Sequence, residues 1–305
     1  MKRPRIKSAM ILIAGIILLI NIDHVKAMLQ HADIGIGGFW MSDPLRIEAE
    51  AAILIDEQTG EVIYAKNETK RLYPASTTKL LTALVALENL SPNETVSAGN
   101  EVEMHTPQEA RAGLFYGQKL TVSELVGAML VPSGNDAART LAVFAAKKHS
   151  GNKDMHPEEG LAYFAELMNE KAKELGAVHS RFSNPHGLHD NGHYSTASDL
   201  ALIAKAAREQ SLIREVAGSS FFAVGDRHFP NRNLLLNPEA GHYYEGATGL
   251  KTGFTDEAGY CLVSSAERSG RKLIAVVLHS SKDSVWQDSA AVLDYGFGKA
   301  GPAAE

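Results

Sequence analysis

The sequence predicts an α/β (α+β) fold, in which helices flank an antiparallel β-sheet and an all-helical lobe is inserted into it. Three observations support this fold class. Short β-type runs lie near residues 51–65, β-type runs return after Phe221, and the segment between about 91 and 210 has helical, polar patterns. Strands at both ends of a chain that bracket a helical middle are most simply joined in one sheet. A cleft is then expected between the sheet and the lobe.

The composition is that of a globular protein with an ample core. The chain has 305 residues, of which 45% are hydrophobic and 22% charged, enough for one large or two modest domains. The net charge of -6 argues against nucleic acid as a partner. The single cysteine, Cys261, excludes an internal disulfide and lies in an apolar run, so we expect it in a buried strand. Nothing in the sequence indicates the oligomeric state.

The N-terminus has the pattern of a secretory signal peptide. Four basic residues within the first seven precede an apolar run over residues 9–20. This run is shorter than the roughly 18–20 residues of a membrane span. Val25 and Ala27 are the small or modest residues that a signal-peptidase site has at its -3 and -1 positions, so we predict a signal peptide over 1–27 and a mature protein outside the cytoplasmic membrane. An uncleaved anchor is the alternative.

The mature chain is divided into a short arm and one domain. Residues 28–46 are glycine-bearing and irregular, and 47–300 form a single domain with sheet parts at about 47–90 and 211–300 and the helical lobe at about 91–210. Residues 51–56 and 61–65 read as a hairpin around Gly60. Apolar spacing predicts helices over 122–130, 137–148, 161–175, 200–207 and 289–297. Residues 249–253 open the returning β region. Apolar runs then predict two central strands over 260–266 and 272–279, covered on both faces and joined by a hairpin at Ser269-Gly270.

The stretch Pro74-Ala75-Ser76-Thr77-Thr78-Lys79 organises the chain because it enters a predicted helix. Ser76 stands at the helix N-terminus, and Lys79 lies one turn further on the same face. A deprotonated Lys79 could take the Ser76 proton, but this needs a pKa shift of roughly 3 units, about 4 kcal/mol. Burial and a second nearby lysine would supply the shift. The simpler interpretation is a helix cap followed by a solvated lysine.

Two further motifs follow in order, Ser133-Gly134-Asn135 and Lys251-Thr252-Gly253. With Ser76-Thr77-Thr78-Lys79 they form a trio known in serine acyl-transfer enzymes. Over residues 51–297 the chain resembles the low-molecular-mass penicillin-binding proteins, the serine D-alanyl-D-alanine carboxypeptidases of the β-lactamase/transpeptidase-like superfamily. Residues 184–188 (Asn-Pro-His-Gly-Leu) and 293–297 (Leu-Asp-Tyr-Gly-Phe) also resemble that family.

The resemblance implies a role for each residue of the first two motifs. Ser76 attacks the carbonyl between the two terminal D-alanines of a peptidoglycan stem peptide, and Lys79 takes its proton. Ser133 relays a proton to the leaving D-alanine. Asn135 holds the substrate amide and orients Lys79.

The third motif is implied to bind the substrate carboxylate. Lys251 supplies the second cation, Thr252 hydrogen-bonds the carboxylate, and Gly253 lets the strand approach closely. The family's oxyanion hole maps to the backbone N–H groups of Ser76 and Phe254. The expected partners are stem peptides ending in D-Ala-D-Ala, with β-lactams as inhibitors, and no metal or cofactor is expected.

The chain departs from the family in two places. The family often has a carboxylate-binding arginine near the last helix, but residues 280–288 contain none. Lys282 could substitute for it, although a lysine lacks the bidentate fork of arginine. The larger members carry a C-terminal β domain and an amphipathic membrane anchor. We expect neither here, because the chain stops at Glu305, just after the catalytic domain.

Two other patterns suggest chemistry that we do not predict. The histidines His186, His189 and His193, with Asp190, resemble a zinc site, but they lie in a glycine-rich loop and the implied mechanism needs no metal. Glu166 resembles a deacylating glutamate of β-lactamases, but its helical position points it to solvent.

Two other functions are kept as alternatives. A serine β-lactamase would need a base for the deacylating water, and no glutamate is well placed for it. A non-catalytic peptidoglycan-binding protein would have no need of an activated serine. Endopeptidase or transpeptidase side activity is left open.

Overall fold

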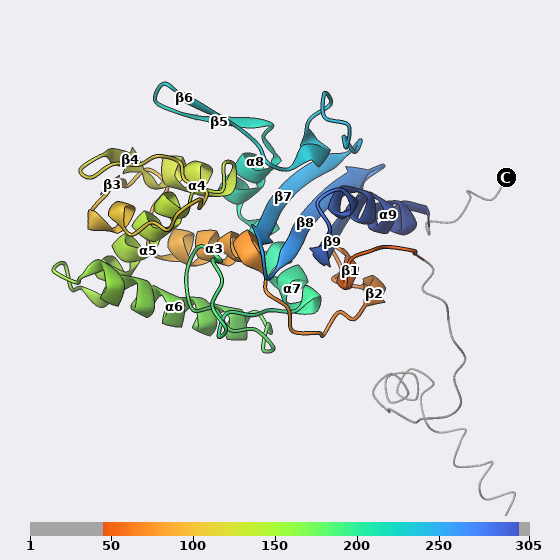
Figure 1. The fold of residues 1–305 in the computed structure, drawn as a ribbon, viewed down its shortest axis with the longest axis horizontal. Helices are drawn as coiled ribbons and strands as arrows, with labels where there is room; N and C mark the ends of the chain where they lie inside the picture. The colour runs from red at the N-terminus through yellow and green to blue at the C-terminus, as the bar shows by residue number, and fades with distance from the viewer. Residues whose placement is uncertain (1–44, 299–305) are drawn as a thin grey trace, which may run out of the picture. The chain divides into compact units, whose positions relative to one another are not determined.

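The structure, a computed structural model, describes residues 45–298. The predicted signal peptide and nearly all of the predicted N-terminal arm lie outside the described residues. Five antiparallel strands form the main sheet in the order β2-β1-β9-β8-β7. Their bounds are Ala51–Asp56 (β1), Val62–Lys66 (β2), Ala247–Thr255 (β7), Gly259–Arg268 (β8) and Arg271–Ser280 (β9). The α/β fold class predicted from the sequence is confirmed (Figure 1).

The sheet joins the two ends of the described chain. β1 pairs with β9, so residues more than 200 positions apart lie side by side. The two predicted hairpins close with residues in the left-handed region: Gly60 has φ 78° after β1, and Ser269 and Gly270 have φ 49° and 78° between β8 and β9. Paired left-handed residues suit two-residue hairpin turns, because their twist matches that of the strands.

Both faces of the sheet are covered, as its continuous apolar strands predict. Helix α9 (Ser284–Gly298) packs on one face, where alternate residues such as Ala52 and Leu54 of β1 join its core. The intervening Ile53 and Ile55 point to the other face, where α7 (Ala197–Glu209) and α8 (Ser211–Gly218) pack. The period-2 alternation of a strand thus divides one apolar run between two cores.

Helix α3 (Lys79–Asn89) leads from the sheet into the lobe and packs against its helices (Figure 1). The lobe contains α4 (Val122–Leu130), α5 (Asn135–Ser150) and α6 (Pro157–Glu174). A Thr121–Glu124 capping box begins α4, and Pro157 occupies the first turn of α6. All residues of α3 from Lys79 to Ala86 are buried, so α3 is the central helix of the molecule.

The structure also contains elements that the pattern analysis did not predict. A two-stranded sheet of β3 (Thr95–Ser97) and β4 (Lys119–Thr121) lies in the otherwise helical middle, since three-residue strands are too short to show a period. Short 3-10 helices occur at Ala75–Thr78 (η1), Asn100–Glu103 (η2) and Leu234–Leu236 (η3), and β5 (Phe221–Val224) and β6 (Arg227–Pro230) form a separate hairpin. Helix α7 belongs to the predicted 91–210 span but packs on β1 and β9.

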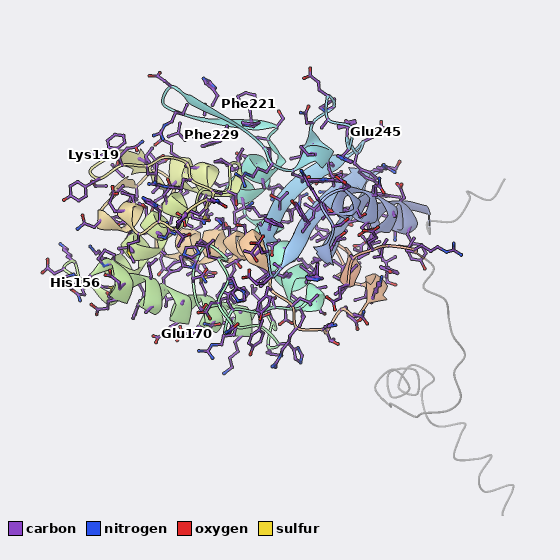
Figure 2. All side chains as sticks on the ribbon, in the orientation of Figure 1. Lys119, His156, Glu170, Phe221, Phe229 and Glu245 are labelled. Carbon is purple, nitrogen blue, oxygen red and sulfur yellow. The ribbon has the colours of Figure 1, made fainter. Side chains whose placement is uncertain are left out.

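The exposure of Glu166 and the burial of Cys261 agree with the predictions from the sequence. Glu166 is exposed on α6, as predicted, one turn from Glu170, whose side chain is labelled in Figure 2. Cys261 is buried in β8, also as predicted, and burial raises the pKa of its thiol to about 12. Between residues 45 and 298, no helix combines the length and hydrophobicity that a membrane crossing requires.

We expect Leu54→Ala to lower the free energy of unfolding by about 2–5 kcal/mol, because Leu54 is fully buried between β1 and α9 and its loss leaves a cavity. Chemical denaturation measures this. The matched control is Val62→Ala on the neighbouring strand, where the side chain is 53% exposed and the change should stay within about 0.5 kcal/mol. Equal effects of the two substitutions would contradict the assigned core.

Candidate active site

Ser76 and Lys79 lie where η1 meets α3. The sequence pattern placed Ser76 at the start of an α-helix, but η1 covers residues 75–78 and α3 begins only at Lys79. The 3-10 turn keeps the i and i+3 side chains on the same side, so the pair still meets. Lys79 Nζ lies 2.8 Å from Ser76 Oγ, 2.7 Å from Asn135 Oδ1 and 2.7 Å from the His186 carbonyl oxygen.

Lys79 is fully buried, and this lowers its pKa well below the usual value. Burial is the main cause, followed by the positive charges of Lys251 and Arg232. Each effect disfavours the ammonium form. Loss of one proton leaves a lone pair that can accept the Ser76 hydroxyl proton, while the other two N–H bonds still reach Asn135 and His186. Lys79 thus has both features that the sequence analysis required of a general base.

Ser133 and Asn135 are presented by the tight turn between α4 and α5. Ser133 is 2% exposed and has a φ of 67°, a left-handed conformation that is uncommon for a non-glycine residue and frequent at functional sites. The backbone N–H of Asn135 donates to the Ala110 carbonyl at 2.8 Å. Asn135 therefore links the turn both to Lys79 and to the loop before β4.

Asp136 supports this turn and was missed by the sequence analysis. Its buried carboxylate accepts hydrogen bonds from the backbone N–H groups of Ala112, Gly113 and Leu114 at 2.7–2.9 Å. Such multiple acceptance fixes a loop that has no regular structure of its own. The only sequence signal was its place directly after Asn135. The buried Arg139–Glu109 ion pair lies beside it and also contacts Asn135.

The third motif lies on β7, at the edge of the sheet. An edge strand has one row of backbone N–H and C=O groups without a neighbouring strand. Lys251 is buried, and burial together with the charge of Arg232 lowers its pKa to about 7. Gly253 lies so close to η1 that a Cβ there would be 3.0 Å from both Ser76 N and the Pro74 carbonyl oxygen. A side chain at this position would therefore require the backbone of η1 to shift.

The loop over residues 183–188 packs against η1 beside Ser76. Gly187 has a φ of 83°, and a Cβ added to it would lie 1.9 Å from the Ala75 carbonyl oxygen. His186 contributes its backbone carbonyl to Lys79, and desolvation by burial lowers the pKa of its ring well below the usual value. Its role at Lys79 is therefore that of a backbone acceptor.

The next two histidines in the chain, His189 and His193, have structural contacts. His193 Nε2 lies 2.8 Å from Thr78 Oγ1, and its Nδ1 accepts from the Ser183 N–H at 3.1 Å, so both ring nitrogens are engaged. His189 packs edge-on against Tyr73. Among the described residues no group of three or more histidine, cysteine and carboxylate side chains is arranged to hold a metal ion.

The three motifs line one cleft of about 480 Å³ between the sheet and the lobe. Ser76, Ser133, Asn135, Thr252, Gly253 and Phe254 all border it. Lys79 and Lys251 are buried behind these residues. The structure therefore brings every predicted site residue to a single cleft.

Arg232 also borders the cleft, and the sequence analysis missed it. It lies in the loop between β6 and η3, held by Asn231, which donates to the Ala217 and Ser219 carbonyls, and by Asn233, which accepts from Leu235 N–H. Lys282, considered from the sequence as a substitute for the family arginine, is exposed and does not border the cleft. A lone arginine in a loop has no pattern, so only the fold reveals its position.

A buried lysine in contact with a serine, facing a second lysine on an edge strand, defines a site for acyl transfer through a serine ester. The family comparison agrees with this class. Residues 39–282 match the model of the peptidase S11 family, D-alanyl-D-alanine carboxypeptidase, and the chain belongs to this family.

Relatives and solved structures support the assignment. The chain is 35% identical to D-alanyl-D-alanine carboxypeptidase DacF of Bacillus subtilis over 77% of its length, and 32% identical to DacB2 of Mycobacterium tuberculosis over 82%. It spans 58% of the former and 82% of the latter. The crystal structure of the Streptomyces K15 DD-transpeptidase has a TM-score of 0.76 at 30% identity, covering 83% of this chain and 98% of that one.

We expect Gly187→Ala to destabilise the protein by at least about 1–3 kcal/mol, because alanine meets both a left-handed φ and the Ala75 carbonyl. Thermal unfolding measures this. Gly241→Ala is the control, since a Cβ at Gly241 meets no atom within 4 Å. An unchanged melting temperature for Gly187→Ala would contradict the close contact between the loop and η1.

Proposed function

We propose that the protein is a serine D-Ala-D-Ala carboxypeptidase that removes the terminal D-alanine from peptidoglycan stem peptides. The observation that carries this proposal is the 2.8 Å contact between Ser76 Oγ and the buried Nζ of Lys79, at a cleft that Arg232 borders and behind which Lys251 is buried. DacF of Bacillus subtilis is named for this activity, although this chain spans only 58% of the length of DacF.

Acylation begins with attack of Ser76 Oγ on the carbonyl carbon of the penultimate D-alanine. Lys79 takes the hydroxyl proton as the new C–O bond forms, and the charge on the carbonyl oxygen is met by the backbone N–H groups of Ser76 and Phe254. Such donors contribute about 3–4 kcal/mol to transition-state stabilisation. The C–N bond then breaks, and the proton passes through Ser133 to the nitrogen of the leaving D-alanine. Water hydrolyses the ester and frees Ser76.

The substrate carboxylate is bound at the Lys251-Thr252-Gly253 motif on β7. Thr252 borders the cleft there, the buried Lys251 lies behind it with Nζ 2.9 Å from the Thr252 carbonyl oxygen, and Arg232 adds a guanidinium at the cleft border. Arginine can bind a carboxylate through two parallel hydrogen bonds. We therefore assign to Arg232 the carboxylate recognition for which Lys282 was considered, while Asn135 holds the substrate amide.

The proposal includes the location and the inhibitors. The peptidoglycan substrate lies outside the cytoplasmic membrane, which agrees with the signal peptide predicted over 1–27. A β-lactam acylates Ser76 in the same way and leaves slowly; penicillin-binding protein D2 of Listeria monocytogenes, solved in an ampicillin-bound form, is similar to this chain with a TM-score of 0.69 at 29% identity, covering 83% of this chain and 99% of that one.

The β-lactamase alternative is less well supported. Glu166 is exposed on the outer face of α6 and does not border the cleft. Glu109 borders it, but its carboxylate is committed to Arg139. Neither is free to activate the deacylating water. Asp256 and Glu257 also border the cleft, and the carboxypeptidase proposal predicts slow release of a β-lactam.

Purified protein should release D-alanine from a peptide ending in D-Ala-D-Ala, and Ser76→Ala should abolish release, because Ser76 carries the hydroxyl that Lys79 Nζ contacts. Coupled detection of free D-alanine measures this. Ser123→Ala, an exchange at a serine of α4 outside the cleft, is the control and should keep the parental rate. Release by Ser76→Ala at the parental rate would refute the assigned nucleophile.

The decrease in kcat/KM at alkaline pH should follow the loss of the Lys251 proton. Its folded-state pKa is lowered to about 7, and only the protonated form attracts the substrate carboxylate, so kcat/KM should fall as pH rises above about 7. Lys251→Arg stays charged and should flatten this fall up to pH about 9. An equal decrease of kcat/KM in the parent and in Lys251→Arg would show that another group causes the decrease.

A further inference from the structure

A second pocket adjoins the catalytic cleft. It encloses about 430 Å³ and is lined by side chains that include Arg71, Tyr73, Tyr194, Glu257 and His279. Glu257 borders both the cleft and this side pocket. None of the site residues described above lines it, so the proposed mechanism leaves it without a role.

Two contacts form the boundary between the cleft and the side pocket. His189 borders the cleft and packs edge-on against Tyr73, with ring centroids 4.6 Å apart. His189 Nδ1 lies 3.8 Å from Glu257 Oε2 on its other side. A substrate chain that leaves the cleft past these two residues enters the side pocket directly.

The direction of the bound peptide leads there. The proposed function places the terminal carboxylate at Lys251 and Thr252 and the reacting carbonyl at Phe254, so the upstream residues continue along β7 toward Glu257. Tyr73 lines the side pocket and precedes Ser76 by three residues, which span at most about 10 Å. One wall of the side pocket therefore lies within reach of a long side chain on a peptide bound at Ser76.

The side pocket offers one group of each charge. Arg71 is exposed and has no ion-pair partner among the described residues; its guanidinium lies over the Tyr194 ring at 4.8 Å from the centroid. Stacking on the ring holds the guanidinium plane and leaves its N–H edge free to donate to a carboxylate. The Glu257 carboxylate, about half exposed, can accept from an amine.

We propose that the side pocket binds the side-chain end of the third residue from the carboxyl end of the stem peptide. Arg71 and Glu257 select a side chain that ends in both a carboxylate and an amine, rather than in an amine alone. This inference rests on the proposed function and adds the class of peptide that the site prefers.

Two pentapeptides that differ only at this residue test the proposal, one with 2,6-diaminopimelate and one with lysine. The full-length protein should cleave the first with a kcat/KM at least about 10-fold higher, as expected for a charge-assisted hydrogen bond. Arg71→Ala should bring the ratio of the two kcat/KM values close to one. Arg71→Lys, which keeps the charge but not the fork, should give an intermediate ratio.

The control is Arg46→Ala, at an exposed arginine that lines neither pocket, and its ratio should equal that of the parent. The ratio is taken on one enzyme sample, so a partly unfolded variant does not distort it. Equal kcat/KM values for both peptides in the parent, or an unchanged ratio in Arg71→Ala, would overturn this inference alone. Release of D-alanine from neither peptide would overturn the proposed function and, with it, this inference.

Discussion

The site depends on one constraint, the burial of the Lys79 amine. A lysine with no solvent contact must have polar partners for its N–H bonds, and Ser76, Asn135 and the His186 carbonyl provide three. These partners come from η1, the α4–α5 turn and the loop over 183–188. Burial of one amine therefore fixes the relative positions of three segments far apart in the sequence, and it also lowers the pKa on which base catalysis depends.

The surrounding scaffold accepts strain to maintain this arrangement. Ser133 has a left-handed φ, and Gly187 and Gly253 occupy positions where a side chain would meet η1. The left-handed φ of Ser133 costs free energy in the folded state and persists where neighbouring contacts determine it. The hydrogen bonds accepted by Asp136 and the buried Arg139–Glu109 pair provide such contacts beside Ser133. The two glycines instead allow the backbone to approach η1 closely.

The sequence predicted the main sheet because its strands are long, apolar and closed by glycine turns. It also predicted which residues meet at the cleft, since the three motifs are short, ordered along the chain and contain most of the reactive groups. The sequence did not predict the roles of Asp136 and Arg232, and the reason is physical. Their roles come from tertiary contacts, with a loop backbone and with a cleft border respectively, and neither leaves a periodic or local signal. The 3-10 start of α3 and the short strands β3 and β4 are likewise set by packing.

The account's central claim is that Lys79 acts as the base for Ser76, and one measurement tests it most directly. Protein treated with benzylpenicillin is digested and mapped by mass spectrometry, beside Lys79→Arg, which places at this position a cation that cannot be deprotonated. The account predicts one penicilloyl adduct, on Ser76, formed in the parent and slowed by at least about 100-fold in the variant. An adduct on another residue, or equal rates of Ser76 acylation in both proteins, would contradict it.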